Sequence, residues 1–482
     1  GMPTLGFSST WSQNVDSELD GQPDVDAWGD DKAGTFDDES GVSWTVSAMR
    51  GCTTMMLVYA SAPGLLDAWV DFGRDGSWNE AGDQVFVSQS LAAGSNQLTF
   101  TLPVTAKAGL TYARFRLSSQ GGLSPTGFAA DGEVEDYAVT IREGFDFGDA
   151  PSPYPTLLAD GGAQHLLVSA SPTLAGADVE PDGQPDANAQ GDDKKGNDDE
   201  NGVGWDGIVM RGWTKTLGVY ATAPGFLDAW IDFDRDGSWN QTGDQIFVSQ
   251  ALQTGQNVLT FTVPATAKAG ASFARFRVSS QGGLSPMGLA IGGEVEDYAV
   301  TIDERLDYGD APSPYPTLAA GDGARHLTVP NTPTLGVPGA WSQNVDSELD
   351  GQPDANASGD DNNQPQGFND EKGVNWGGIL IRGWTKTMTV HASAPGFLDA
   401  WIDFDRDGDW DEAADQIFAS HALQAGQNTL TFTVPVTAKA GATFARLRIS
   451  SQGGLSPTGF AADGEVEDYA VTIDERLDYG DA

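Results

Sequence analysis

The stretch FLDAWIDFDRDGSWNQTGDQIFVSQ, residues 226–250, joins two alternating apolar and polar runs through a loop rich in aspartate. Alternation with a period of two is typical of β-strands that bury one face. The two runs therefore predict a β-hairpin, with residues 232–244 as its connection. Near-copies of the same stretch occupy residues 65–89 and 397–421.

The hairpin belongs to a larger repeated unit. The motif GEVEDYAV begins at Gly132, Gly293 and Gly464, and both this motif and the acidic loop advance by 161 and then 171 residues. A period this long corresponds to a whole domain and not to a solenoid turn. We expect a first repeat over residues 1–144 that lacks its N-terminal segment, a second over 145–305, a third over 306–475, and the start of a further repeat at 476–482.

Strand patterns fill each unit. In the second repeat, alternating runs begin at Thr214, Phe226, Asp244, Asn257, Ser272 and Glu294, separated by Gly, Pro and Asn turns. No long segment has helical periodicity. Many short strands with turns between them predict an all-β chain of three tandem antiparallel β-sandwiches with long acidic loops of calcium-binding type.

The charge of the chain limits its partners. Asp and Glu number 70 against 25 Lys and Arg, a net charge of −45. Such a surplus repels nucleic acid and anionic membrane surfaces, and it favours cations as partners. The single cysteine, Cys52, excludes an intramolecular disulfide. No apolar run of about 18 residues is present, so we expect no direct membrane insertion.

The acidic loop resembles the start of a calcium-binding loop. Ca²⁺ takes six to eight oxygen ligands, and acids at positions 1, 3 and 5 with glycine at 6 supply three of them. The glutamate expected at position 12 is missing, and an aspartate follows instead. The alternative is a splayed surface turn without metal. The candidate ligands in the three copies are Asp71, Asp75 and Asp83; Asp232, Asp234, Asp236 and Asp244; and Asp403, Asp405, Asp407 and Asp415. Gly73 replaces the second acid in the first copy, which predicts the weakest site.

Two other groups of acids are candidate ligands. The upstream acidic segment contributes Asp192, Asp193, Asp198, Asp199 and Glu200; the alternative is a solvated loop. In GEVEDY, Glu294 and Glu296 share strand parity with core-facing residues, so they must be paired, metal-bound or at the rim. One of them is an alternative to Asp244 as the residue that closes the metal site. If no metal binds there, we expect pairing with Arg275 or Arg277. The equivalent glutamates are Glu133, Glu135, Glu465 and Glu467.

Together these motifs resemble the GEVED domain. The resemblance rests, in family order, on DYGDAP at Asp307, GARH at Gly323, GDD at Gly191, DDE at Asp198, DFDRDGSW at Asp232 and GEVEDY at Gly293. It covers essentially the whole chain. It implies an extracellular, calcium-supported β-sandwich repeat of large secreted or surface-anchored bacterial proteins, without catalytic activity. The departures are Gly73, Gln164 in GAQH, and the missing DYGDAP segment of the first copy.

No arrangement in the sequence is typical of an enzyme. The four histidines have no nucleophile and acid placed near them, and His165 and His326 are equivalent positions that favour packing or hydrogen bonding. We therefore expect a stalk or adhesive segment in contact with neighbouring repeats. The alternative is a module that binds a cell-surface glycan or protein. For that alternative the candidate residues are Trp230 and Trp401, unless they pack beneath a loop.

Overall fold

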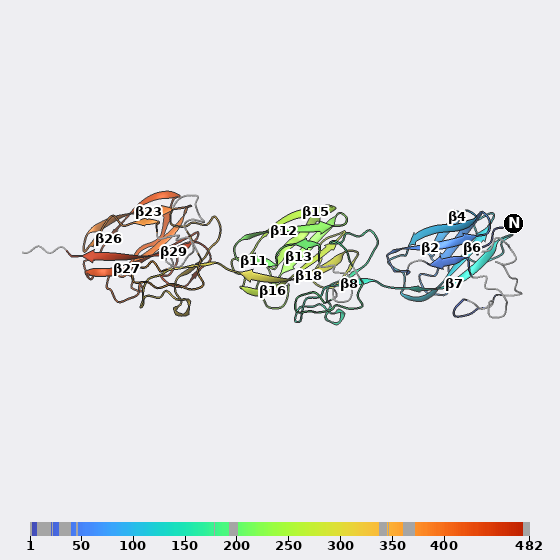
Figure 1. Cartoon of the computed structure of the whole chain (residues 1–482), viewed down its shortest axis with the longest axis horizontal. Helices are drawn as coiled ribbons and strands as arrows, with labels where there is room; N and C mark the ends of the chain where they lie inside the picture. Colours follow the sequence, from blue (N-terminus) through green and yellow to red (C-terminus); the bar gives the residue numbers. More distant parts are fainter. Residues whose placement is uncertain are drawn as a thin grey trace, which may run out of the picture.

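The computed structural model describes residues 2–6, 21, 23–27, 40–44, 47–177, 179–191, 201–336, 345, 347–359 and 372–475, and in it three β domains lie in a row (Figure 1). The described residues form strands, turns and two short 3₁₀ segments. Among them, no helix has the length and apolar character that crossing a membrane requires.

The second repeat shows the architecture most fully. Its strands are β8 (Phe145–Phe147), β9 (Gln164–Leu166), β10 (Val203–Gly204), β11 (Ile208–Met210), β12 (Thr214–Ala221), β13 (Gly225–Ile231), β14 (Gln245–Leu252), β15 (Gly255–Thr262), β16 (Gly270–Ser279), β17 (Leu289–Ile291) and β18 (Glu294–Asp303). One sheet has the order β10-β12-β15, and the other β11-β18-β16-β13-β14. A small sheet, β17-β9-β8, holds the entering segment against the second of these.

The third repeat has the same three sheets, whereas the described strands of the first repeat form the two main sheets without the small one. The first contains β1 (Val42–Trp44), β2 (Thr53–Ala60), β3 (Gly64–Val70), β4 (Gln84–Leu91), β5 (Gly94–Thr101), β6 (Gly109–Ser118) and β7 (Glu133–Ile141). The third contains β19 (Leu306–Tyr308), β20 (Arg325–Leu327), β21 (Val374–Asn375), β22 (Leu380–Ile381), β23 (Thr385–Ala392), β24 (Gly396–Ile402), β25 (Gln416–Leu423), β26 (Gly426–Thr433), β27 (Gly441–Ser450), β28 (Phe460–Ala461) and β29 (Glu465–Asp474).

The predicted sandwich and its six long strands are confirmed. All pairings between the long strands of the second repeat are antiparallel, such as β12 with β15 and β16 with β18. Two short pairs are parallel instead, β11 with β18 and β17 with β9. The strands β11 and β17 are too short to carry an alternating pattern, so they could not be recognised in the sequence.

Each repeat has its own hydrophobic core between its two sheets. In β13 the side chains of Leu227, Ala229 and Ile231 point inward and are buried. In β15 Phe261 is 7% exposed, whereas Val258, of opposite parity, is 72% exposed. Burial of one large apolar side chain contributes about 1.5–3 kcal/mol, so these alternating rows fix which face of each strand turns inward.

A bulge lies where β13 pairs with β14, just before the acidic loop. The register shifts between Leu227 and Trp230. The buried Asp228 carboxylate accepts hydrogen bonds from the backbone N–H groups of Ser249 and Leu284, at 2.8 and 3.0 Å. A bulge bends a strand and changes the direction of the residues after it. The hairpin therefore reaches the acidic loop in a direction held by these two hydrogen bonds.

Candidate metal centre

The acidic loop of the second repeat is fixed to the sheet at both ends. The backbone N–H of Ile231 donates to the carbonyl oxygen of Asp244 at 2.9 Å, and that of Asp232 donates to the carbonyl oxygen of Phe273 at 3.1 Å. Both aspartates are buried. Carboxylates that extend from a fixed hairpin keep defined positions, which a metal site requires.

The side chain of Asp232 winds the loop into a tight turn. Its two oxygens accept the backbone N–H groups of Asp236, at 3.2 Å, and Gly237, at 2.9 Å. This reversal places Arg235 at φ 55° and Gly237 at φ 86°, in the left-handed region where glycine carries no steric penalty. The loop is therefore wound tightly around the buried Asp232 carboxylate, while Asp236 stays exposed at its outer edge.

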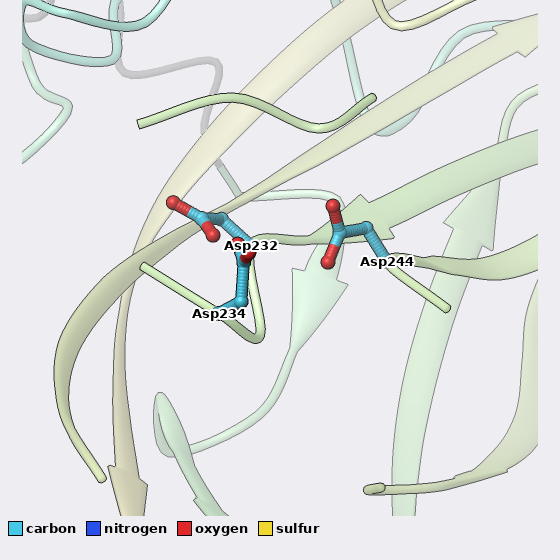
Figure 2. Close-up of side chains that lie close together, drawn as sticks. All are labelled: Asp232, Asp234 and Asp244. Carbon is cyan, nitrogen blue, oxygen red and sulfur yellow. The ribbon is translucent and has the colours of Figure 1, made fainter. Parts of the chain in front are cut away.

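Three carboxylates converge in this loop (Figure 2). Asp232, Asp234 and Asp244 each offer an oxygen, and these oxygens all lie within 4.8 Å of one another. Asp234 Oδ1 is buried, and no hydrogen bond from the described residues reaches it. Two carboxylates about 4 Å apart repel by about 4 kcal/mol at an effective dielectric near 20. A hard cation that prefers oxygen ligands would fit this donor set and replace the repulsion with attraction.

The structure thus brings Asp244, the loop's own last aspartate, to the candidate site. Asp236, at position 5 of the loop, does not join the group. Its carboxylate accepts hydrogen bonds from the Ser238 N–H at 2.9 Å and from Gln241 Nε2 at 2.8 Å. These hydrogen bonds, that from Gln241 above all, lower the pKa of Asp236.

In the third repeat, the aspartate at position 5 of the loop, Asp407, does belong to the group of converging carboxylates. Asp403, Asp405 and Asp407 form one group of converging carboxylates, and Asp405, Glu412 and Asp415 form a second. Glu412 was not among the ligands predicted from the sequence. The signal that could have identified it is the extra acid three residues before Asp415, where the second repeat has Gln241.

Burial makes the closing aspartates hard to ionise without metal. Desolvation raises the pKa of Asp244 to about 6, although hydrogen bonds from the Phe233 and Gln241 N–H groups oppose the shift. The charge of Asp232 raises it further. Desolvation likewise raises the pKa of Asp415 to about 7. Both values exceed those of the unfolded chain, so the metal-free fold loses stability as pH rises through about 6 and 7.

We predict that calcium binding near pH 6 releases protons, because ligation requires Asp244 and Asp415 to be ionised. Titration calorimetry at about pH 6, in two buffers of different ionisation enthalpy, should give different apparent binding enthalpies. The two enthalpies should converge at about pH 8, where both aspartates are already ionised. Identical enthalpies in both buffers at the lower pH would contradict this prediction.

The first repeat winds its loop in the same way. Asp71 accepts the N–H groups of Asp75 and Gly76, at 3.2 and 3.0 Å, and Asp83 accepts that of Phe72 at 3.2 Å. Gly73 stands where the second repeat has Asp234. The scaffold of the loop is therefore present, but one of the converging carboxylates is not.

We predict that Gly73→Asp strengthens calcium binding by the first repeat. A Cβ at this position would press only on the carboxylate end of Glu80, which is flexible, and the backbone of Gly73 has no positive φ. Calcium titration should show tighter binding, whereas the matched change Gly76→Asp should not, because Gly76 has φ 85°. Equal affinities for parent and Gly73→Asp would refute the prediction.

A tyrosine from the entering segment contacts the loop, a contact not predicted from the sequence. The Tyr154 hydroxyl donates to Asp232 Oδ2 at 2.6 Å, and its ring lies 4.5 Å from that of Trp239, centroid to centroid. Tyr315 repeats the hydrogen bond to Asp403 at 2.5 Å. The signal that could have identified it is the sequence PSPYP, which occurs at residues 151–155 and again at 312–316.

Beneath Trp239 lies a buried ion pair. Arg275 donates two hydrogen bonds to Asp297, at 2.7 and 2.6 Å, and both side chains are fully buried. The guanidinium lies 4.3 Å from the centre of the Trp239 ring. Asp297 also accepts the N–H of Ala150 at 2.9 Å. The ion pair thus ties the acidic loop to the entering segment.

The GEVEDY glutamates lie elsewhere. Glu296 is buried and accepts the Gly202 N–H at 2.9 Å and the Tyr298 hydroxyl at 3.0 Å. Glu294 accepts the N–H of Leu174. Glu133, Glu135, Glu465 and Glu467 make equivalent contacts. In the described part of the chain, no converging carboxylate group includes any of them.

The expected pairing of Glu296 with an arginine is therefore corrected. Arg275 pairs with Asp297, because the register of β16 and β18 places these two residues directly opposite each other on the outer face. Arg277 instead donates to His165 Nε2 at 3.0 Å. The other ring nitrogen of His165, Nδ1, lies 2.9 Å from the carbonyl oxygen of Gly292, so the hydrogen-bonding role expected for this residue is confirmed. Burial and the neighbouring Arg277 lower the pKa of His165 well below its usual value.

Two sets of predicted residues remain. Asp192, Asp193, Asp198, Asp199 and Glu200 lie outside the described residues. Trp230 and Trp401 are each 3% exposed and pack with Trp239 and Trp410, respectively. Neither ring offers a free face for stacking, which favours the packing alternative over a sugar-binding role.

A family model of the GEVED domain matches the chain three times, at residues 65–140, 226–301 and 397–472. Each match begins in the strand before the acidic loop and ends in the GEVEDY strand. No curated protein matches the sequence of the chain.

Solved structures resemble the chain at low identity. They include native alpha-2-macroglobulin of E. coli (9% identity, 90% of this chain, 23% of that chain, TM-score 0.21). A tetra-tandem repeat from the extending region of a large adhesion protein also matches (11% identity, 90% of this chain, 73% of that chain, TM-score 0.26). So does a D1–D4 ectodomain fragment of ICAM-5 (10% identity, 90% of this chain, 76% of that chain, TM-score 0.21).

Proposed function

Three GEVED domains follow one another in this chain, and from this we propose that it is an extracellular repeat region stabilised by calcium. It would act as a stalk or adhesive segment of a large bacterial surface or secreted protein. Family membership supports the extracellular placement. The linear arrangement of the three domains, one after another, supports a stalk (Figure 1). We propose no catalytic role.

The observation that carries the proposal is the recurrence of the carboxylate cluster. Asp232 with Asp234, and Asp403 with Asp405, converge at equivalent points of two successive domains. An isolated acidic cluster is common on protein surfaces. A cluster that is wound inward by its own backbone, part buried and repeated on the same hairpin is an arrangement that a cation would stabilise.

Calcium would serve as a local cross-link. A ligand that binds only the folded state stabilises it by RT ln(1 + [Ca]/Kd). Extracellular modules use sites with Kd of about 10⁻⁴ to 10⁻³ M. Such a site would hold β13 and β14 together at the loop, in a chain whose one cysteine forms no internal disulfide.

Calcium bound in the loop would also affect the junctions between domains, because the loop contacts the segment that enters each domain. Asp232 binds Tyr154, which lies in the segment after the first junction, and Asp403 binds Tyr315 after the second. Occupation of the loop would therefore stiffen the segment through which each domain joins the one before it. The neighbouring repeats of the same chain are, on this view, its principal partners.

Small-angle scattering tests the stalk proposal. With calcium at fixed ionic strength, the maximum dimension should be larger and its distribution sharper than in EDTA. The matched control is Tyr154→Phe with Tyr315→Phe, which keeps the rings but removes both hydroxyls, and which should reduce the difference. A maximum dimension unchanged by calcium would count against calcium as the stiffening agent.

The alternative, a glycan-binding or surface-ligand-binding module, has less support. Trp401 and Trp410 line a pocket of about 540 Å³ next to the third acidic loop. Their rings are nevertheless almost fully buried. A glycan array with hits that depend on Trp401 would favour this alternative.

A further inference from the structure

The acidic loop of the third repeat carries more negative charge than its two counterparts. Residues 403–415 contain seven Asp and Glu, whereas residues 71–83 and residues 232–244 contain four each. Like charges at this spacing repel one another unless a cation lies between them. The added acids therefore make this loop the one of the three in which bound cations would have the largest effect.

The basic side chains beside the loop offset little of this charge. Arg406 directs its guanidinium to two backbone carbonyl oxygens, each at 2.9 Å. Lys439 Nζ lies 3.5 Å from Asp405 Oδ2, and the two side chains are 58% and 46% exposed. Ion pairs with this exposure are weak, because water screens them.

Glu412 is the added acid that meets buried members of the loop. Oxygens of Asp405, Glu412 and Asp415 all lie within 4.8 Å of one another. Asp405 also belongs to the group that it forms with Asp403 and Asp407, so the two groups share it. Together they contain five carboxylates, and a single divalent ion would leave most of that charge unbalanced.

Asp415 presents a buried oxygen to this second group. The residue is 1% exposed, and its Oδ1 accepts a backbone N–H at 3.0 Å. No N–H or hydroxyl of the described residues reaches its Oδ2. In the other two repeats the same oxygen is occupied: Asp83 Oδ2 accepts the N–H of Glu80, and Asp244 Oδ2 that of Gln241, both at 3.1 Å. A buried carboxylate oxygen needs a partner, and carboxylates surround this one.

The two acids that meet this oxygen occur together only in the third repeat. The first repeat has the glutamate, as Glu80, but Gly73 in place of the aspartate. The second repeat has the aspartate, as Asp234, but Gln241 in place of the glutamate. Each of these loops therefore holds one half of the group.

We propose that Asp405, Glu412 and Asp415 bind a second calcium ion in the third repeat. It would lie beside the ion held by Asp403 and Asp407, with Asp405 shared between the two. Carboxylate oxygens are the ligands that Ca²⁺ prefers, and Asp415 Oδ2 would supply one that is already buried. The inference rests on the proposed function, because it takes calcium as the ion of the first group.

Equilibrium dialysis of the whole chain at saturating calcium counts the bound ions. Glu412→Gln, which installs the residue found in the second repeat, should bind one ion fewer per chain than the parent. The remaining ions should bind with unchanged affinity. An unchanged count would mean that one ion serves both groups, and it would overturn this inference while leaving the proposed function intact. A parent chain that binds no calcium would overturn both.

The matched control is Asp409→Asn. Asp409 forms a third group with Asp407 and Glu412, but in that group no described oxygen is buried without a partner. This variant should bind as many ions as the parent. If it also loses one, the ion belongs to the third group or responds to charge alone, and the proposal is wrong.

Melting in EDTA separates a lost ion from a damaged fold. Glu412→Gln should melt at the same temperature as the parent or higher, because it removes one of several repelling charges. A lower melting temperature in EDTA would contradict the crowding of carboxylates from which the second site is inferred, and would overturn the proposal.

Discussion

Removing calcium will lower the melting temperature of the second and third repeats by about 5–11 °C. A site at a free calcium concentration of about 100 Kd contributes about 2.7 kcal/mol. In domains of this size each kcal/mol corresponds to about 2–4 °C. Differential scanning calorimetry in EDTA and in calcium, at fixed ionic strength, measures the shift. Equal melting temperatures in the two conditions would remove the basis for a metal site.

The variant Asp234→Asn distinguishes the loss of calcium binding from damage to the metal-free fold. Asp234 Oδ1 receives no hydrogen bond from the described residues, whereas Asp232 holds the turn, so only the former can be changed without unwinding the loop. In EDTA the variant should be at least as stable as the parent, because one repelling charge is gone. In calcium it should be less stable. Asp160→Asn, an exposed site with the same change of charge, should respond to calcium like the parent.

Asp297→Ala will destabilise the second repeat by about 3–5 kcal/mol, because it leaves the guanidinium of Arg275 buried without its counterion. That guanidinium would keep its hydrogen bonds to the carbonyl oxygens of Pro155 and Pro286, but these do not neutralise its charge. Urea unfolding monitored by hydrogen exchange, which reads each repeat separately, measures the loss. The backbone amides of the acidic loop should lose their protection from hydrogen exchange together with those of the strands.

The first repeat provides the matched control. Its equivalent pair, Arg114 and Asp136, has side chains 23% and 32% exposed, and exposed pairs contribute about 0–1 kcal/mol. Asp136→Ala should therefore cost far less than Asp297→Ala. The difference arises because the entering segment covers the pair in the second repeat, where Ala150 donates to Asp297 and Pro155 accepts from Arg275. Equal costs in the two repeats would show that this cover contributes nothing.

The repeated hairpin and the sandwich were predictable from the sequence because one buried face imposes alternation along each long strand. Leu259 and Phe261 share a face in sequence and in space. The short parallel strand β11 was not predictable, because a strand of three residues is too short to show an alternation of apolar and polar side chains. The acids at position 1 and position 3 of the loop were identified correctly as neighbours, because a tight turn brings residues of such spacing together whatever surrounds it.

The sequence could not decide whether Asp244 or Glu296 closes the candidate metal site. That choice depends on which strand ends lie next to the loop in the folded domain. The same limit explains the Arg275 pairing. Asp297 has the opposite parity to Glu294 and Glu296 and so lies on the outer face, but only the register of β16 against β18 shows that it stands opposite Arg275. Tyr154 was overlooked because its partner, Asp232, is 78 residues away. Contacts between distant segments are the part that pattern analysis does not reach.

The position of β18 determines how a pulling force would pass through a domain. This strand leads directly into the linker toward β19, and it is flanked by β16 on one side and by β11 on the other. Tension applied along it loads the hydrogen bonds of both ladders in shear, so that many must fail together instead of opening one after another. A domain loaded in this way would therefore resist unfolding until both ladders fail.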